Sequence, residues 1–115
     1  MFKHKLHELA DRVEKILSTR DFLAHHQNME AFLDLIDDIK AEISCVKAEA
    51  ASFFSKNPNS RYELLVLVNL ETTEKWVDDA YSWFVRAKEE RFNIAMICLR
   101  IAIDENAKHL SLIGL

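Results

Sequence analysis

The sequence predicts an all-α fold, an antiparallel four-helix bundle that associates with itself, and three observations support this. The 115 residues include one glycine, Gly114, and one proline, Pro58, whereas sheet proteins need both residue types at their turns. Half of the residues are hydrophobic and 30% are charged, a balance typical of a globular protein. Apolar residues recur at intervals of three and four, the repeat of an amphipathic helix. The length fits a single domain, residues 1–115.

The first helix is expected over residues 3–17. Its apolar positions alternate in steps of four and three: Phe2, Leu6, Leu9, Val13 and Ile16. Continuing that phase would place Arg20, Gln27 and Glu30 on the apolar seam. The segment 18–21, Ser-Thr-Arg-Asp, is therefore expected to end this helix and to cap the next one.

The second helix is expected over residues 22–56 and has the most regular pattern in the chain. Its seam keeps a heptad alternation without a miss: Met29, Phe32, Ile36, Ile39, Ile43, Val46, Ala50 and Phe53. Four heptads of this kind indicate helix-on-helix packing. The helix is expected to end before the loop 56–60, because Pro58 moves Asn57 out of helical geometry.

The third helix is expected over residues 61–86, opened by a capping box in which Ser60 and Glu63 bond each other's backbone. One apolar seam comprises Val66, Leu70, Thr73, Val77, Ala80, Phe84 and Ala87, and a second stripe comprises Tyr62, Asn69, Trp76 and Trp83. Two adjoining stripes are wider than one neighbouring helix covers. The third helix is therefore expected to face at least two neighbours.

The fourth helix is expected over residues 90–111, after a turn in the charged segment 88–91. One continuous helix from 61 to 110 is the alternative, but it would be unusually long. From Ile94 to Ile103 the pattern is apolar nearly all round except at Arg100, which is typical of a helix that is central or covered by a second subunit. We expect the exposed remainder of helices three and four to form a homo-oligomer interface. Arg100 is expected to pair with Asp104, with a bound anion or an intersubunit salt bridge as alternatives.

Composition also narrows the functional classes. The net charge of −4 argues against a general DNA- or RNA-binding protein. Cys45 and Cys98 are expected to be reduced, buried thiols of a cytoplasmic protein. The chain has neither a secretory signal nor an apolar run of the ~20 residues that a membrane span requires. A single glycine leaves no room for a P-loop or a dinucleotide fingerprint. The sequence thus predicts a protein that is not an enzyme, with no catalytic residue, metal site or cofactor.

Two groups of residues are candidates for binding. The second helix carries an acidic strip, defined here as Glu30, Asp34, Asp37 and Asp38. Such a strip is either a solvated face or a surface that docks onto a basic protein partner, as in small inhibitors, immunity proteins and adaptors. Under the second interpretation Asp34, Asp37 and Asp38 are the partner-binding residues.

The second candidate group lies on the third helix. The aromatic stripe through Trp76 is either core or a platform on which a purine base stacks, with Arg61 beside it for a phosphate. Asn69, an amide among apolar neighbours, needs a partner from the protein or from a ligand. The ligand-binding hypothesis therefore names Arg61, Asn69 and Trp76.

Residues 59–80 also resemble a known family. The pattern is carried by Asn59-Ser60-Arg61, Leu65, Leu70-Glu71, Trp76 and Ala80. It resembles the helical hairpin of the small phage anti-defence proteins that sequester cyclic oligonucleotide signals of CBASS and Thoeris immunity. The resemblance implies a helical oligomer that binds cyclic nucleotides between subunits without turning them over, with Arg61 as a ligand contact.

Overall fold

The computed structural model describes residues 2–115, which form four α-helices and one short 3-10 helix, without a strand in that range. The elements are α1 (Leu6–Leu17), η1 (Phe22–Ala24), α2 (Gln27–Lys56), α3 (Glu63–Val85) and α4 (Glu89–Leu112). The predicted all-α fold is confirmed. The largest difference in bounds is at α2, which begins five residues later than expected because residues 22–24 form η1 instead.

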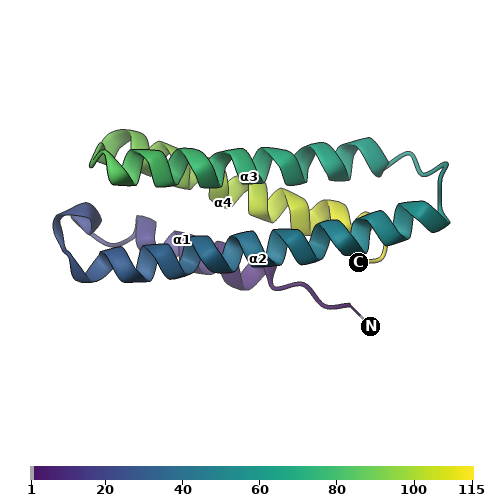
Figure 1. Ribbon diagram of the computed structural model, residues 1–115, viewed down its shortest axis with the longest axis horizontal. Helices are drawn as coiled ribbons and strands as arrows, with labels where there is room; N and C mark the ends of the chain where they lie inside the picture. The colour runs from purple at the N-terminus through teal and green to yellow at the C-terminus, as the bar shows by residue number, and fades with distance from the viewer. Residues whose placement is uncertain (1) are drawn as a thin grey trace.

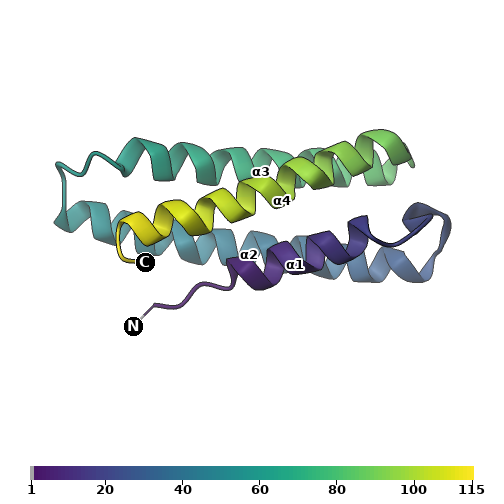
Figure 2. The ribbon, with the colours of Figure 1, turned by 180° about the vertical axis from the view of Figure 1, so that it is seen from behind.

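The helices lie along the long direction of a molecule that measures 48 × 24 × 18 Å. Figure 1 shows α2 and α3 side by side in front, with the chain reversing direction between them. Figure 2 shows α1 and α4 in front when the molecule is seen from behind. Each helix contacts the next along the chain, and α1 also packs against α4. The core fills the space that these four contacts enclose.

The start of α1 is fixed by two hydrogen bonds. The backbone N–H of Lys5 donates to Glu42 Oε2 of α2 at 3.0 Å, and the N–H of Leu6 donates to His4 Nδ1 at 3.4 Å. These bonds satisfy donors that a helix N-terminus would otherwise leave free. They also anchor α1 to the middle of α2, with Leu6 fully buried beneath them.

Aromatic rings fill the core at the end where η1 meets the α3–α4 turn. Phe32 and Phe92 are fully buried and pack edge to face, with ring centroids 5.3 Å apart. Phe84 stacks on Phe32 at 4.3 Å, and Phe22 of η1 stacks on Phe92 at 6.1 Å. The elements η1, α2, α3 and α4 thus each contribute one ring to this cluster. The stacking of Phe22 on Phe92 holds the segment 18–26 against the core.

The α2 seam is mostly as predicted, with one correction at each end. From Phe32 to Ala50 the predicted seam residues are buried. Met29 is instead 44% exposed, and Phe54 is buried in place of the half-buried Phe53. A straight helix drifts relative to a strict heptad repeat, so a seam of four heptads loses its phase at the ends.

A turn separates α3 from α4, as predicted, but it lies at residues 86–88, because residues 89–91 of the expected segment 88–91 already belong to α4. The N–H of Lys88 donates to the carbonyl of Trp83 at 3.1 Å, and the N–H of Ala87 donates to that of Phe84 at 3.1 Å. This is a Schellman-type helix end, which needs a left-handed residue. Ala87 occupies that position with φ of 54°, although glycine is the residue that adopts it without cost.

Two local predictions are wrong. The capping box does not form, because α3 begins at Glu63 and the Ser60 hydroxyl accepts the N–H of Tyr62 at 3.3 Å instead. The turn that follows Asn57 extends through residue 62, and the N–H of Glu63 donates to the Ser60 carbonyl at 3.4 Å and not to its hydroxyl. The cysteines are unpaired but not buried, since Cys45 is exposed and Cys98 half-buried. Both lie one or two positions away from the buried seam of their helix.

Candidate functional site

The three predicted ligand contacts occupy different surroundings along α3. Arg61 lies in the turn before the helix and is exposed. Its Nη2 donates to the Tyr62 hydroxyl at 2.8 Å, and its guanidinium lies 5.0 Å from the centroid of the same ring. Arg61 is thus held by its neighbour, with the rest of its guanidinium facing solvent.

Asn69 has its partner within the protein. Its Nδ2 lies 3.3 Å from Nδ1 of His109 on α4. An amide nitrogen can only donate, so His109 Nδ1 is the acceptor of this hydrogen bond. The Nε2 of His109 lies 3.5 Å from Glu105 Oε2. The amide is therefore satisfied without a ligand.

A second polar pair joins the same two helices one turn away. Asn106 is 2% exposed, and its Nδ2 donates to the hydroxyl of Thr73, which is fully buried. The Thr73 hydroxyl in turn donates to the carbonyl of Asn69 at 2.9 Å. We name Asn69, Thr73, Asn106 and His109 the polar ladder. Sequence reasoning missed it because Asn106 and His109 lie more than thirty residues from their partners.

Trp76 is half-buried and packs against the core, with the ammonium of Lys75 5.7 Å from its ring centroid. At 1.5 Å per helical residue, about 10 Å of α3 separates Asn69 from Trp76, and Arg61 lies about as far on the other side. One chain therefore does not gather the three residues around a single small ligand.

Trp83 contacts two arginine side chains, whereas Tyr62 and Trp76 of the same stripe each contact one cation. The guanidinium carbons of Arg86 and Arg91 lie 5.1 Å and 5.0 Å from its ring centroid. Arg91 comes from α4, so this cluster depends on the turn at residue 87. Cation–π contacts of this type fix the two arginines at the end of the molecule.

The predicted partner-binding carboxylates are all exposed on α2. Asp38 pairs with Arg12 of α1 at 2.7 Å. Asp34 lines a hollow of about 420 Å³ between α1 and α2, which Arg12 and Lys15 also line. Asp34 and Asp38 therefore lie on the α1 side of the molecule, and Arg12 neutralises Asp38 there.

Arg100 does not pair with Asp104, as the sequence had suggested. Its Nε lies 3.1 Å from Glu14 Oε2 on α1. Arg100 therefore points from α4 toward α1, where Glu14 is the carboxylate within reach. The expectation that Arg100 needs a carboxylate was right, but its partner is on another helix.

The fold shifts the pKa of His4. Burial at the start of α1 lowers the pKa of its imidazole, and the neighbouring His7 lowers it further, while Glu42 acts in the opposite direction. The two imidazole rings lie 6.1 Å apart. His4 is consequently held in its neutral form to lower pH than a free histidine.

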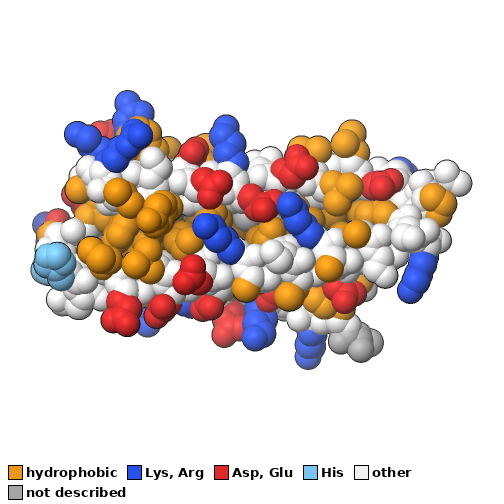
Figure 3. Space-filling view, in the orientation of Figure 1, with side chains coloured by type: hydrophobic (Ala, Val, Ile, Leu, Met, Phe, Trp, Pro, Cys, Tyr) orange, Lys and Arg blue, Asp and Glu red, His pale blue; other side chains and the backbone are white. Residues whose placement is uncertain are grey.

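Besides Leu64, Leu65 and Val68 in α3 and Leu112 in α4, large apolar side chains are exposed in two groups. One is a row on the outer face of α4, Ile94, Ile97 and Ile101, which we name the α4 stripe; they are 48–55% exposed. The other spans two helices and is named the α2–α3 patch: Met29, Leu33, Tyr81 and Val85, 37–63% exposed. Figure 3 shows apolar side chains gathered between α2 and α3 at the end near the α3–α4 turn.

No family model, curated protein or solved structure matches the chain. Within residues 2–115, every helix is too short or too polar to cross a membrane. The features of this chain that could bind a partner are its exposed side chains. They are the apolar groups and the acidic strip on the helices, and the guanidinium of Arg61.

Proposed function

We propose that this chain is a non-catalytic binding protein, an antiparallel four-helix bundle that associates with itself and acts through the outer surfaces of its helices in the cytoplasm. The observation that carries the proposal is the exposure of large apolar side chains on regular helices. Val85, Ile94 and Ile101 are each more than half exposed. Contiguous apolar surface on a folded chain is typical of protein–protein interaction sites, because leaving it in water costs free energy.

The partner that the acidic strip favours is a protein with a basic face. Asp34 and Asp37 are exposed and belong to no ion pair among residues 2–115, whereas Asp38 is bound to Arg12. Opposite charges on two surfaces accelerate association and set its orientation. These charges support a role like that of small inhibitors, immunity proteins and adaptors.

Reversing the two available charges tests this function. The variant D34K/D37K should lose the partner that wild type captures by cross-linking in host lysate, with the melting temperature nearly unchanged because both side chains are exposed. A matched control is E71K, which reverses an exposed carboxylate on α3. Equal capture by wild type and D34K/D37K would contradict the role of the strip.

A second candidate is a sponge for cyclic oligonucleotide signals of phage anti-defence type. The specific observation is the exposed guanidinium of Arg61, which a phosphate between subunits could share with Tyr62, within the segment that resembles this family. A ligand at 100 times its Kd stabilises the folded state by about 2.7 kcal/mol. Melting curves measured with cyclic di- and trinucleotides should therefore shift upward, and R61A should remove the shift while the exposed control R20A keeps it. Unshifted curves across the panel would eliminate this candidate.

A further inference from the structure

The broad side of the molecule formed by α2 and α3 joins an apolar area to a charged one. Next to the α2–α3 patch lies a hollow of about 220 Å³ between the two helices. Figure 3 shows the apolar area passing directly into a band of Lys, Arg, Asp and Glu side chains along this side. We name the patch and the hollow together the α2–α3 face.

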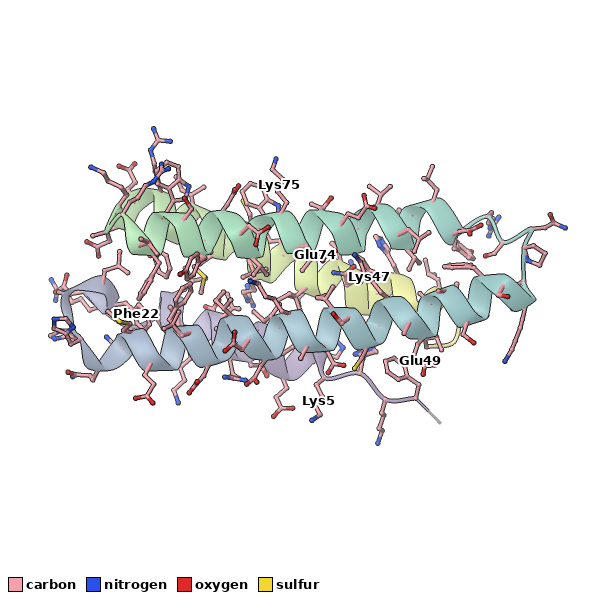
Figure 4. All side chains as sticks on the ribbon, viewed as in Figure 1. Lys5, Phe22, Lys47, Glu49, Glu74 and Lys75 are labelled. Atoms are coloured by element: carbon pink, nitrogen blue, oxygen red, sulfur yellow. The ribbon has the colours of Figure 1, made fainter. Side chains whose placement is uncertain are left out.

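The charges at the hollow and in the ion pair beside it are sorted by helix. Cations come from α2, as Lys40 and Lys47, and anions come from α3, as Glu74 and Asp78. Lys47 and Glu74 pair across the face within one chain, and Figure 4 shows them pointing toward each other. Lys40 and Asp78 line the hollow, are exposed, and take part in no ion pair among residues 2–115.

We propose that the α2–α3 face binds a second copy of this chain about a two-fold axis parallel to the helices. Such an axis places α2 of one copy against α3 of the other, so that each Lys40 meets the Asp78 of its partner copy. The apolar patches then cover each other at the same end. This inference rests on the self-association in the proposed function and assigns it a surface and a geometry.

A second copy fits the face better than other occupants because the face is complementary to itself. In a two-fold interface the same patch serves both partners, so cations and anions must be present in matching positions. An axis across the helices would place α2 against α2 and would lose this matching. The face belongs to the 48 × 24 Å side of the molecule, which has room for the ~800 Å² per partner that stable complexes bury.

The α4 stripe is the less suitable surface for this contact. It is a single row on one helix, whereas the patch combines Leu33 of α2 with Tyr81 and Val85 of α3. Tyrosine is enriched at interfaces because its ring is buried while its hydroxyl stays hydrogen-bonded. The two surfaces face different sides of the molecule, so single variants distinguish them.

The test is a charge reversal followed by mixing, measured by sedimentation velocity over a concentration series. K40E places two anions opposite each other in its own dimer, and D78K places two cations opposite each other. Each variant alone should dimerise at least about tenfold more weakly than wild type. An equimolar mixture should recover dimers. In the mixed dimer both contacts are again between opposite charges. The glutamate introduced at position 40 of one chain faces the lysine introduced at position 78 of the other. The second contact is the native one, between Asp78 of the K40E chain and Lys40 of the D78K chain.

Two apolar variants separate this surface from the alternative. V85K should dissociate the dimer, and I101K on the α4 stripe should leave it intact, with circular dichroism confirming that both remain helical. Dimers that survive V85K but not I101K would overturn the assignment while leaving self-association in place. Dimers that persist in K40E and D78K, or that fail to recover on mixing, would overturn the geometry. A wild-type chain that is monomeric at every concentration would refute self-association itself.

Discussion

Replacing Ala87 with glycine should stabilise the protein, because Ala87 holds a left-handed conformation at the end of α3. Its φ is 54°, and the conformation is required by the bond from Lys88 N–H to the Trp83 carbonyl. A non-glycine residue pays about 1–2 kcal/mol to adopt this region. Glycine loses about 0.5–1 kcal/mol more backbone entropy on folding. The Ala87 methyl is exposed, so no packing is lost, and A87G should gain roughly 0.5–1 kcal/mol.

Urea unfolding followed by circular dichroism at 222 nm measures this gain. A stabilisation of this size corresponds to a rise in melting temperature of a few degrees for a domain of this length. The matched control is G114A at the end of α4, where φ is 81° and no atom lies within 4 Å of an added methyl. G114A should destabilise, by up to about 1 kcal/mol, since only the backbone strain changes. A lower unfolding midpoint for A87G would refute the reasoning.

Three further predictions concern the core, the polar ladder and pH. F92A should destabilise by about 3–5 kcal/mol, because Phe92 is fully buried among three other aromatic rings; a loss under 1 kcal/mol in urea unfolding would contradict this packing. N106A should cost about 1–3 kcal/mol, and a double-mutant cycle with T73V should give a coupling energy above about 0.5 kcal/mol, whereas additive losses would show that the two side chains act independently. The pKa of His4 is lowered in the folded state, so unfolding takes up a proton and stability should fall as pH drops through 6.5 and below; H4Q should flatten this part of the pH profile, and an unchanged slope would exclude His4 as its source.

The fold could be predicted because helices one to three carry long periodic seams. Leu6, Val13, Ile39 and Val77 fall on the predicted faces and are buried. Helix ends were less predictable, since they depend on hydrogen bonds with distant residues. The start of α1 uses Glu42, thirty-seven residues away, and the end of α3 uses an alanine where glycine would have been the signal.

The candidate site was less predictable than the fold because charged and amide side chains bind residues on other helices, which are far away in the sequence. Arg100 was expected to bond one turn along its own helix, yet α1 brings Glu14 closer. Asn69 was recognised as needing a partner, but only the packing of α3 on α4 identifies that partner as His109. Periodicity shows which face a residue occupies, and it says nothing about which helix lies opposite.

The polar ladder explains why α3 and α4 pack against each other more extensively than any other two helices. The contact between α2 and α3 has no such buried polar pair among the described residues. Asn106 and Thr73 are buried, so a sliding of α4 along α3 would leave an amide or a hydroxyl without a partner in the core. The ladder therefore fixes the register of this hairpin. Between α2 and α3, in contrast, the polar side chains are exposed and one ion pair, Lys47 with Glu74, crosses the gap. An exposed pair contributes at most about 1 kcal/mol and specifies little. The hairpin α3–α4 is thus held by buried polar contacts, while the α2–α3 face keeps exposed apolar surface.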